Sequence, residues 1–416
     1  MTGPAGGAGR GVTLLILLGA LTFNAALCLA NTVAVHVTDS GVMGAEVVLI
    51  LAALALALRR DPAPYLVLAV FLSYAALLMA LRPLLDLKAA RDFLIPITFY
   101  ALGRRWSDPR LADRAALASG LVVLAFGLFE ATALDTYTRF FNIAQYYVAR
   151  GSAVPVDAAQ SEFGTQASAL FTSGIRPDAR TILPFLGPHR TSSVFLEPVS
   201  MGNFGAILYL WSLCRPGMAH RRLVMALGAA AIVLADARFG LYVCAAGTGT
   251  CLIGSRLPRF VWFALPFAML AGFAVYGFTS TAVDWSNDIG GRMLWTARLL
   301  TSLSDSAVWG LSADKPFLSD SGYAYSLNQI GLVGVAGFWA LFVFLPERNP
   351  AAWRFRCGVA TYVCLLLVIS DSVYSIKTGA LLWFMLGSSD GAPAAATAER
   401  RRPAHARIPA AAVPAT

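Results

Sequence analysis

Charged side chains are scarce in this chain of 416 residues: Asp, Glu, Lys and Arg together make up 13% of it. A water-soluble protein carries about 25%, because its surface must be covered by groups that hydrate well. Hydrophobic residues instead reach 57%. They form runs of roughly 15 to 22 residues, long enough to cross the ~30 Å hydrocarbon core as helices and without the alternation of barrel strands. The sequence therefore predicts an all-α polytopic membrane protein.

Signatures of metal, nucleotide or disulfide binding are also lacking. The six cysteines lie in or at the edges of apolar runs, and no two have Cys-x-x-Cys spacing. No Asp-x-Asp, His-Glu-x-x-His or P-loop motif occurs, so neither a metal-bound sugar nucleotide nor ATP is implied. We therefore expect no cofactor and no metal.

The net charge of +9 is not gathered into one basic patch. The basic residues fall in short clusters between apolar runs, a pattern typical of cytoplasmic loops that face anionic lipid. We expect the lipid bilayer as a partner and no nucleic acid.

About twelve apolar segments are candidate membrane spans, and they divide the chain into three parts. Residues 1–12 form a cytoplasmic N-terminus before a first span that we expect to be uncleaved. Residues 13–388 form the integral membrane domain, and residues 389–416 an Ala/Pro-rich, disordered cytoplasmic tail. The candidate spans are 13–35, 42–58, 64–81, 92–103, 115–134, 194–214, 222–236, 239–254, 259–278, 326–346, 357–371 and 376–388.

Basic residues are unequally divided between the two sets of short connections. By the positive-inside rule the richer set, and both termini with it, is cytoplasmic. The richer set holds Arg59, Arg60, Arg104, Arg105, Arg110, Arg114, Arg215, Arg221, Arg222, Arg256, Arg259, Arg348, Arg354 and Arg356. The poorer set holds Arg82, Lys88, Arg91, Arg238 and Lys377.

Two long polar connections, about 135–193 and 279–325, then fall on the outer side of the membrane. The first carries enough tyrosine and phenylalanine to fold back as short helices on the membrane face. The second carries three tryptophans, a residue type that suits a membrane interface: Trp285, Trp295 and Trp309.

A polar run from His189 to Asn203 leads from the first long connection into the next span. Arg190 is expected near the outer surface, and Glu197 at or below it. A carboxylate in an apolar span costs a few kcal/mol unless it is paired or hydrated, so Glu197 is functional by default. The alternative is a structural pair between Glu197 and a neighbouring arginine.

Two further arginines stand at expected turns. Arg238 lies in Asp236-Ala-Arg-Phe-Gly240 on the outer side, against the charge bias, which favours function over an exposed Asp–Arg pair. Arg292 follows two glycines at an expected helix start, where amides, helix dipole and guanidinium would face one anion. Asp320 precedes the next span.

These arginines are expected to converge on the outer face of the bundle. Guanidinium groups recognise phosphate bidentately, which lysine cannot do. The expected ligand is a lipid-linked phosphate or pyrophosphate reached from outside.

The order of these motifs resembles the Wzy-type polysaccharide polymerase and O-antigen ligase superfamily of bacterial inner membranes, over roughly residues 100–345. That family has about a dozen spans and a large periplasmic loop before a span. His189-Arg-Thr-Ser-Ser-Val-Phe-Leu-Glu-Pro198 is similar to its arginine-centred motif, and Asp236-Ala-Arg-Phe-Gly240 to its Ser-Arg-Gly-type turn. Four further motifs resemble the second loop of that family and the helix after it: Gly291-Arg292, Trp309-Gly310, Asp320-Ser-Gly-Tyr323 and Gly331-Leu-Val-Gly334.

The resemblance implies glycosyl transfer between two undecaprenyl-pyrophosphate-linked glycans. The growing chain would leave its lipid pyrophosphate and join a hydroxyl of the incoming repeat unit. The arginines would stabilise the leaving-group charge. Glu197, His189 or Asp320 would be the base, by position only. A chain-length regulator and a flippase are the implied protein partners.

One departure from the family pattern indicates which branch of the family, polymerase or ligase, this chain resembles more. Ligase members carry a histidine late in the second loop, where this chain has Asp320-Ser-Gly, and this favours the polymerase. An O-antigen ligase-like or other lipid-phosphate glycosyltransferase, a transporter or flippase, and a receptor or scaffold stay open. Twelve spans fit a transporter, but no inverted repeat is seen.

Overall fold

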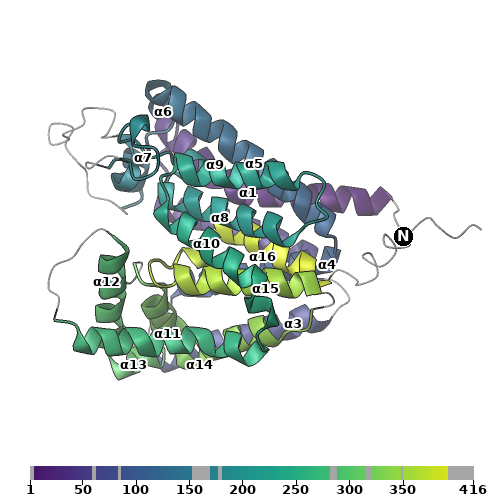
Figure 1. Ribbon diagram of the computed structural model, residues 1–416, viewed down its shortest axis with the longest axis vertical. Helices are drawn as coiled ribbons and strands as arrows, with labels where there is room; N and C mark the ends of the chain where they lie inside the picture. Colours follow the sequence, from purple (N-terminus) through teal and green to yellow (C-terminus); the bar gives the residue numbers. More distant parts are fainter. Residues whose placement is uncertain are drawn as a thin grey trace, which may run out of the picture.

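The structure, a computed structural model, describes residues 4–58, 62–82, 86–151, 169–176, 180–281, 288–314, 318, 320–347 and 350–391. In these ranges the regular secondary structure is helical, apart from an isolated bridge between Ile175 and His189. Most of the long helices run across the view of Figure 1, side by side. Features named above that lie outside the described residues are Arg59, Arg60, Trp285, Arg348 and the tail from residue 392.

Each of the twelve candidate spans is largely helical in the structure. Six helices are long and apolar enough to cross a membrane, which gives the described chain the make-up of a multi-pass helical membrane protein. These six are α1 (Pro4–Val33), α2 (Asp39–Ala57), α3 (Pro62–Leu81), α5 (Pro109–Thr132), α11 (Arg259–Thr279) and α14 (Gly322–Phe344).

The other six helices are shorter or more charged, and a crossing by each of them stays a prediction. One of them, α9, has 14 residues and rises about 21 Å, less than the ~30 Å hydrocarbon core. Another, α4, has 20 residues but carries charged groups at both ends. The six are α4 (Leu87–Trp106), α8 (Pro198–Cys214), α9 (Arg221–Leu234), α10 (Arg238–Leu252), α15 (Pro350–Leu366) and α16 (Ile376–Gly391).

Two helices extend into segments that the sequence assigned to terminal tails. The first, α1, begins at Pro4, and α4 contacts it further along: the Trp106 indole donates to the Thr13 hydroxyl (2.9 Å). The last, α16, continues beyond residue 388, where the Asp390 carboxylate lies against the buried Arg356 guanidinium (2.6 Å). Tertiary contacts therefore support both extensions, and neither contact is local in sequence.

Helix α8 lies in the middle of the bundle, with nearly all of its side chains buried. Around it, glycines set the helix spacing. Gly103 on α4 and Gly387 on α16 face each other so closely that an added Cβ would lie 2.1 Å from the Phe384 carbonyl oxygen or 2.0 Å from that of Tyr100. Small residues at such crossings let membrane helices approach closely. A side chain at either glycine would force α4 and α16 apart.

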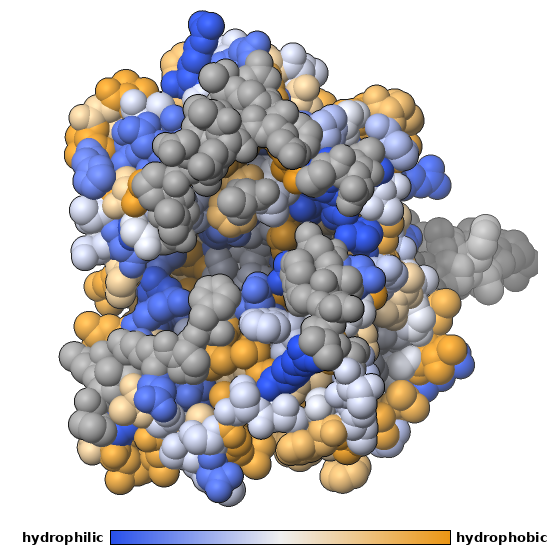
Figure 2. Space-filling model, turned by 90° about the vertical axis from the view of Figure 1, so that its left-hand side faces the viewer, coloured by the Kyte–Doolittle hydropathy of each residue, from blue (hydrophilic) through white to orange (hydrophobic). Residues whose placement is uncertain are grey.

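The two long connections form one end of the bundle, at the left of Figure 1, and we call it the loop end. The first connection contains the short helices expected there, α6 (Leu134–Phe140) and α7 (Ile143–Ala149), and the second contains α12 (Ile289–Ser302) and α13 (Asp305–Val308). Figure 2 faces this end: its surface is hollowed in the middle, and hydrophilic side chains border the hollow. Single 3-10 turns occur at Thr172–Gly174, Pro184–Leu186, Ser193–Phe195, Gly254–Arg256 and Ser372–Tyr374.

Helix α14 is broken at Gly331, where φ is +67° and ψ is 170°. Gly310, which follows α13, also has a positive φ of +73°, and its backbone lies directly against the break: a Cβ on Gly310 would meet the Gly331 nitrogen at 2.6 Å. Only glycine combines this backbone conformation with such a close approach. The buried Arg82 joins the two segments by donating to the carbonyls of Gly310 (3.4 Å) and Asn328 (3.1 Å).

Candidate functional site

The turn between α9 and α10 is organised by Asp236, a fully buried residue with φ of +47°. Its carboxylate accepts the backbone N–H groups of Thr181 (3.2 Å) and Ile182 (2.6 Å) and pairs with Nε of Arg176 (2.8 Å). These contacts hold a conformation that is strained for a residue with a side chain. The alternative of an exposed turn is therefore wrong at Asp236, whose carboxylate ties the first connection to α9 and α10.

Four arginines gather near this one carboxylate, and we call them the arginine cluster: Arg176, Arg180, Arg190 and Arg238. Burial and the charge of the neighbouring Arg176 lower the pKa of Arg190 to about 10, so it stays charged at neutral pH. Burial also lowers the pKa of Arg176 and of Arg180, against the opposing effect of Asp236. Among the described residues, four guanidinium groups thus gather at one carboxylate, and guanidinium groups are the side chains that bind oxyanions best.

The members of the arginine cluster differ in exposure. Arg180 and Arg190 are buried, at 5% and 7% exposure. Both donate to backbone carbonyls: Arg190 to Ala235 (3.0 Å) and Ser173 (2.9 Å), and Arg180 to Leu234 (3.0 Å). The other two members are half-buried. The buried pair therefore holds the chain segments together, and the half-buried pair brings charge towards the surface.

The segment that carries Arg190 is bound by Glu130, a fully buried carboxylate on α5. Its oxygens accept the backbone N–H groups of Ser192 (2.9 Å) and Ser193 (2.6 Å), and Nε2 of His189 lies 3.1 Å away. Ser193 has φ of +54°, so these bonds also hold a strained turn. Sequence reasoning missed Glu130, although a carboxylate inside an apolar run is the same signal that identified Glu197.

Glu197 lies where this segment enters α8, and its side chain is 27% exposed. Its carboxylate pairs with Nζ of Lys377 on α16 (3.3 Å) and accepts the hydroxyls of Tyr147 on α7 (2.5 Å) and Ser200 (2.9 Å). Burial raises the pKa of Glu197, but Lys377 and the two hydroxyls outweigh it and leave the pKa below its ordinary value. Glu197 is therefore ionised at neutral pH and is paired with a lysine, not with an arginine.

A second group of charges lies at the loop-end turns of α4, and we call it the central polar cluster: Lys88, Arg91, Asp92, Tyr325 and Asp371. Arg91 pairs with Asp92 (2.6 Å) and with Glu46 of α2. The Tyr325 hydroxyl of α14 donates to Asp92 (2.6 Å), and Nζ of Lys88 lies 5.6 Å from the centre of the Tyr325 ring.

Asp371, in the connection from α15 to α16, joins the central polar cluster to the Glu197 site. Burial raises the pKa of Asp371 to about 7, an effect that Lys88 opposes and that Asp92 and Glu197 reinforce. Asp371 therefore lies within electrostatic range of both groups of charges. Sequence reasoning counted Lys88 and Arg91 only as loop charges and passed over both aspartates.

Arg292 and Asp320 form an ion pair of 3.0 Å between the second connection and the start of α14, with side chains 32% and 44% exposed. The N-terminus of α12 is expected from the sequence to face an external anion. In the structure a carboxylate of the chain itself caps it: the Asp288 side chain accepts a hydrogen bond from the Gly291 N–H group (2.8 Å). Helix α12 packs against α11 and α14, so the Arg292–Asp320 pair belongs to a different group of helices from the arginine cluster. Of the three arginines expected to converge, Arg190 and Arg238 thus lie together, whereas Arg292 lies beside Asp320.

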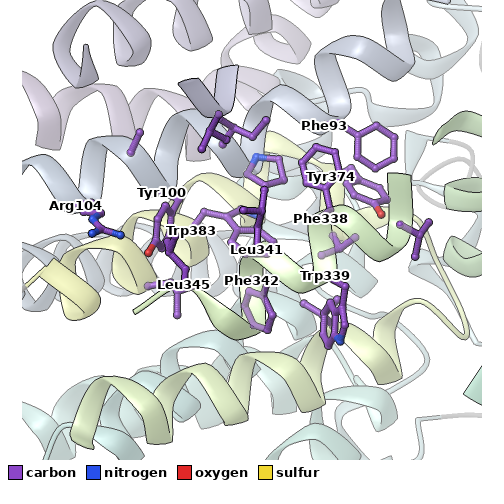
Figure 3. A pocket seen from close by; sticks show the side chains of 18 of the residues that line it. Phe93, Tyr100, Arg104, Phe338, Trp339, Leu341, Phe342, Leu345, Tyr374 and Trp383 are labelled. Atoms are coloured by element: carbon purple, nitrogen blue, oxygen red, sulfur yellow. The ribbon is translucent and has the colours of Figure 1, made fainter. Parts of the chain in front are cut away.

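An apolar cavity of about 670 Å³ lies between α3, α4, α14 and α16. Figure 3 shows Phe93 and Tyr374 at one end of it and Tyr100 and Arg104 at the other. Tyr374 is also close enough to Asp371 for the two to interact electrostatically. The cavity therefore begins beside the central polar cluster and leads away from the loop end.

Comparison with protein-family models, with curated proteins and with solved structures finds no match to this chain. Membership of the polymerase and ligase superfamily stays a prediction from the motifs. Within the described residues, no group of three or more His, Cys, Asp or Glu side chains is placed to hold a metal ion.

Proposed function

We propose that this chain is a glycosyltransferase that polymerises undecaprenyl-pyrophosphate-linked oligosaccharide repeat units at the periplasmic face of the bacterial inner membrane. The observation that carries the proposal is the arginine cluster, four guanidinium groups around one buried carboxylate at the loop end. A pyrophosphate has the charge and the oxygen geometry that guanidinium pairs bind best. The loop end is taken as periplasmic because its short connections are poor in Lys and Arg.

In the proposed reaction the bond between the anomeric carbon of the growing chain and its pyrophosphate oxygen breaks. A new bond forms from that carbon to a hydroxyl oxygen of the incoming repeat unit. The lipid pyrophosphate leaves as an anion, and the hydroxyl proton passes to a base. Arg176 and Arg238 receive the leaving charge in this scheme, while Arg180 and Arg190 fix the backbone that carries them.

Asp371 is a further candidate for that base beside the residues named from the sequence, because its pKa of about 7 leaves it able to accept a proton near neutral pH. His189 stays a candidate, since its hydrogen bond to the buried Glu130 carboxylate is an arrangement that orients a histidine base. Glu197 has a lowered pKa, and Asp320 is paired with an arginine. We assign Glu197 to positioning, because it joins α7, α8 and α16.

The Arg292–Asp320 pair fits a second contact with the substrate. In Figures 1 and 2, which share a vertical axis, the hollow of the loop end lies between the height of α7 and that of α12. A glycan seated in the hollow would have the first connection on one side and this half-exposed pair on the other.

Deletion of the gene followed by analysis of lipid-linked intermediates tests the function. A polymerase defect leaves a single repeat unit on the lipid. A ligase-like enzyme would leave long chains on the lipid instead, and that outcome would refute the polymerase. Reintroduction of the wild-type chain must restore polymer.

Reporter fusions test the orientation on which the proposal rests. A reporter at Ala307, in α13, is expected in the periplasm, and one at Met218, between α8 and α9, in the cytoplasm. A cytoplasmic signal at Ala307 would place the arginine cluster on the wrong side for this reaction.

Transport of a lipid-linked oligosaccharide is a second candidate, and the break of α14 at Gly331 favours it. Broken helices with a site at the break occur in many transporters. The deletion strain separates the two functions. After loss of a transporter the lipid-linked unit is protected from enzymes added on the periplasmic side, whereas after loss of a polymerase it is accessible to them.

A further inference from the structure

The buried side chains that helix α3 contributes to the described bundle lie in one half of its length. Its loop-end half packs through the buried Phe71 and Leu78, and the Tyr74 hydroxyl donates to the Ile330 carbonyl (2.6 Å). In its other half, Pro62–Val70, every side chain is exposed or half-buried. The apolar cavity lies behind this half, where only small α3 side chains line it: Ala63, Pro64 and Val67.

The cavity has the length of one lipid leaflet with its headgroup. Along α4 its lining extends from Phe93 to Ser107, a rise of about 21 Å. Half of a bilayer of ~40–45 Å, headgroup regions included, is about 21 Å. Its volume of about 670 Å³ lies within the range of pockets that bind small molecules. Left empty, a space of this size would cost the walls their packing contacts, so an apolar chain from the bilayer is expected to fill it.

The mouth of the cavity at the far end from the loop end carries a basic side chain. Arg104 lines it. Two described carboxylates of this region pair with other arginines: Asp390 with Arg356 (2.6 Å) and Glu347 with Arg259 (2.6 Å). Among the described residues, Arg104 is therefore the side chain placed to meet an anionic group that enters this mouth.

We propose that this cavity binds one anionic phospholipid of the adjacent leaflet, with an acyl chain along α4 and α14 and the phosphate at Arg104. The chain enters beneath the loosely packed half of α3. Binding fills the space that α3 leaves open and so holds α3 against α4.

The opposite end of the cavity does not suit a charged headgroup. There the hydroxyls of Tyr374 and Ser326 hydrogen-bond to each other (2.7 Å). A lipid-linked substrate with its pyrophosphate at the arginine cluster would have its headgroup at the loop end. The occupant proposed here has its headgroup at the other end, so it is distinct from the proposed substrate.

The test is native mass spectrometry of the full-length chain, purified in mild detergent and offered phosphatidylglycerol, phosphatidylcholine and undecaprenyl phosphate as separate probes. The wild type is expected to retain one phosphatidylglycerol, about fivefold over phosphatidylcholine, the preference expected from one arginine near a headgroup. Arg104→Gln should bring the two phospholipids to equal retention. Arg110→Gln is the matched control, because Arg110 is exposed at the same end on α5 and lies outside the cavity lining.

A second pair of variants tests whether the cavity holds the acyl chain of the phospholipid. Val67→Trp fills the cavity and should reduce retained phospholipid at least tenfold. Val70→Trp makes the same change on the same helix at a side chain that is 61% exposed, and it should leave retention unchanged. Equal loss in both variants, equal retention of the two phospholipids by the wild type, or preferential retention of undecaprenyl phosphate would overturn the proposal.

Discussion

The two long connections carry motifs of similar strength in the sequence, yet the structure builds them differently. In the first, Arg190 is buried and bound to carbonyls, and the segment around it rests on the buried carboxylates Glu130 and Asp236. In the second, Arg292 and Asp320 form one half-exposed ion pair at the start of α14. A buried network fixes geometry, whereas an exposed pair contributes little to stability. We therefore expect damage in the first connection to unfold the site and damage in the second to leave the fold intact.

The largest effect is expected from removing the anchor of the first connection. Glu130→Ala leaves two buried N–H groups and His189 without their acceptor, and breaking such a buried interaction costs about 3–5 kcal/mol. Denaturant unfolding in detergent micelles measures the loss. Asp39→Ala removes a carboxylate that is 51% exposed and paired with Arg150, so it should cost less than about 1 kcal/mol. Equal losses would erase the contrast between buried and exposed carboxylates.

Loss of charge in the arginine cluster should come next. Arg238→Ala or Arg190→Ala removes a contact to the leaving pyrophosphate or its support, which costs about 3–4 kcal/mol, or 10²–10³ in rate. Lysine at either position should restore only part of the polymer, because it keeps the charge without the bidentate fork. Polymer formed per unit of inserted protein is the measurement, with the exposed Arg354→Ala as control. Full polymer from Arg238→Ala at normal abundance would remove the cluster from the mechanism.

The pH dependence of stability should reveal Asp371. Because its pKa in the folded protein is raised to about 7 from an ordinary 3.8, the folded state favours the protonated carboxyl. The contribution of this carboxyl group to folding stability is therefore fully present below about pH 4, and it is lost as the pH rises through 7. The amide of the Asp371→Asn variant does not titrate, so this position should add no pH dependence to the stability of the variant. The Tm of the wild type should therefore fall relative to that of the variant between pH 5 and pH 8. A constant difference across that range would contradict the raised pKa.

The smallest effect is expected in the second connection. A double-mutant cycle with Arg292→Ala and Asp320→Ala should give a coupling free energy below about 1 kcal/mol, because both side chains are partly solvated. If the pair touches the glycan, Arg292→Ala lowers polymer formation at unchanged stability. A coupling of several kcal/mol would show that the second connection is as tightly built as the first.

Helix positions could be predicted well because they depend on local apolar runs. The run at 42–58 became α2 (Asp39–Ala57), and the Thr38 hydroxyl that accepts from Gly41 N explains its start. Six of the helices have the length and apolar composition that a membrane crossing requires, and crossings by the other six stay predictions.

The candidate site was harder to predict, because its contacts join segments far apart in the chain. The Glu130 carboxylate meets the amides of Ser192 and Ser193 some 60 residues later, and the pKa of Asp371 depends on Lys88 of α4. No local pattern encodes these distances. One local pattern was overlooked: Asp288 stands three residues before Gly291, the spacing of a helix cap that already satisfies the N-terminus of α12.

The glycine contact between α4 and α16 has a consequence for biosynthesis. Gly103 and Gly387 are separated by about 280 residues, so α4 emerges from the ribosome roughly 15 to 60 s before its closest neighbour exists. During that interval the face of α4 that will meet α16 lacks its native neighbour. A nascent chain stalled before α16 should therefore remain loosely assembled and sensitive to protease at α4, and release of the last helix should lock the whole bundle.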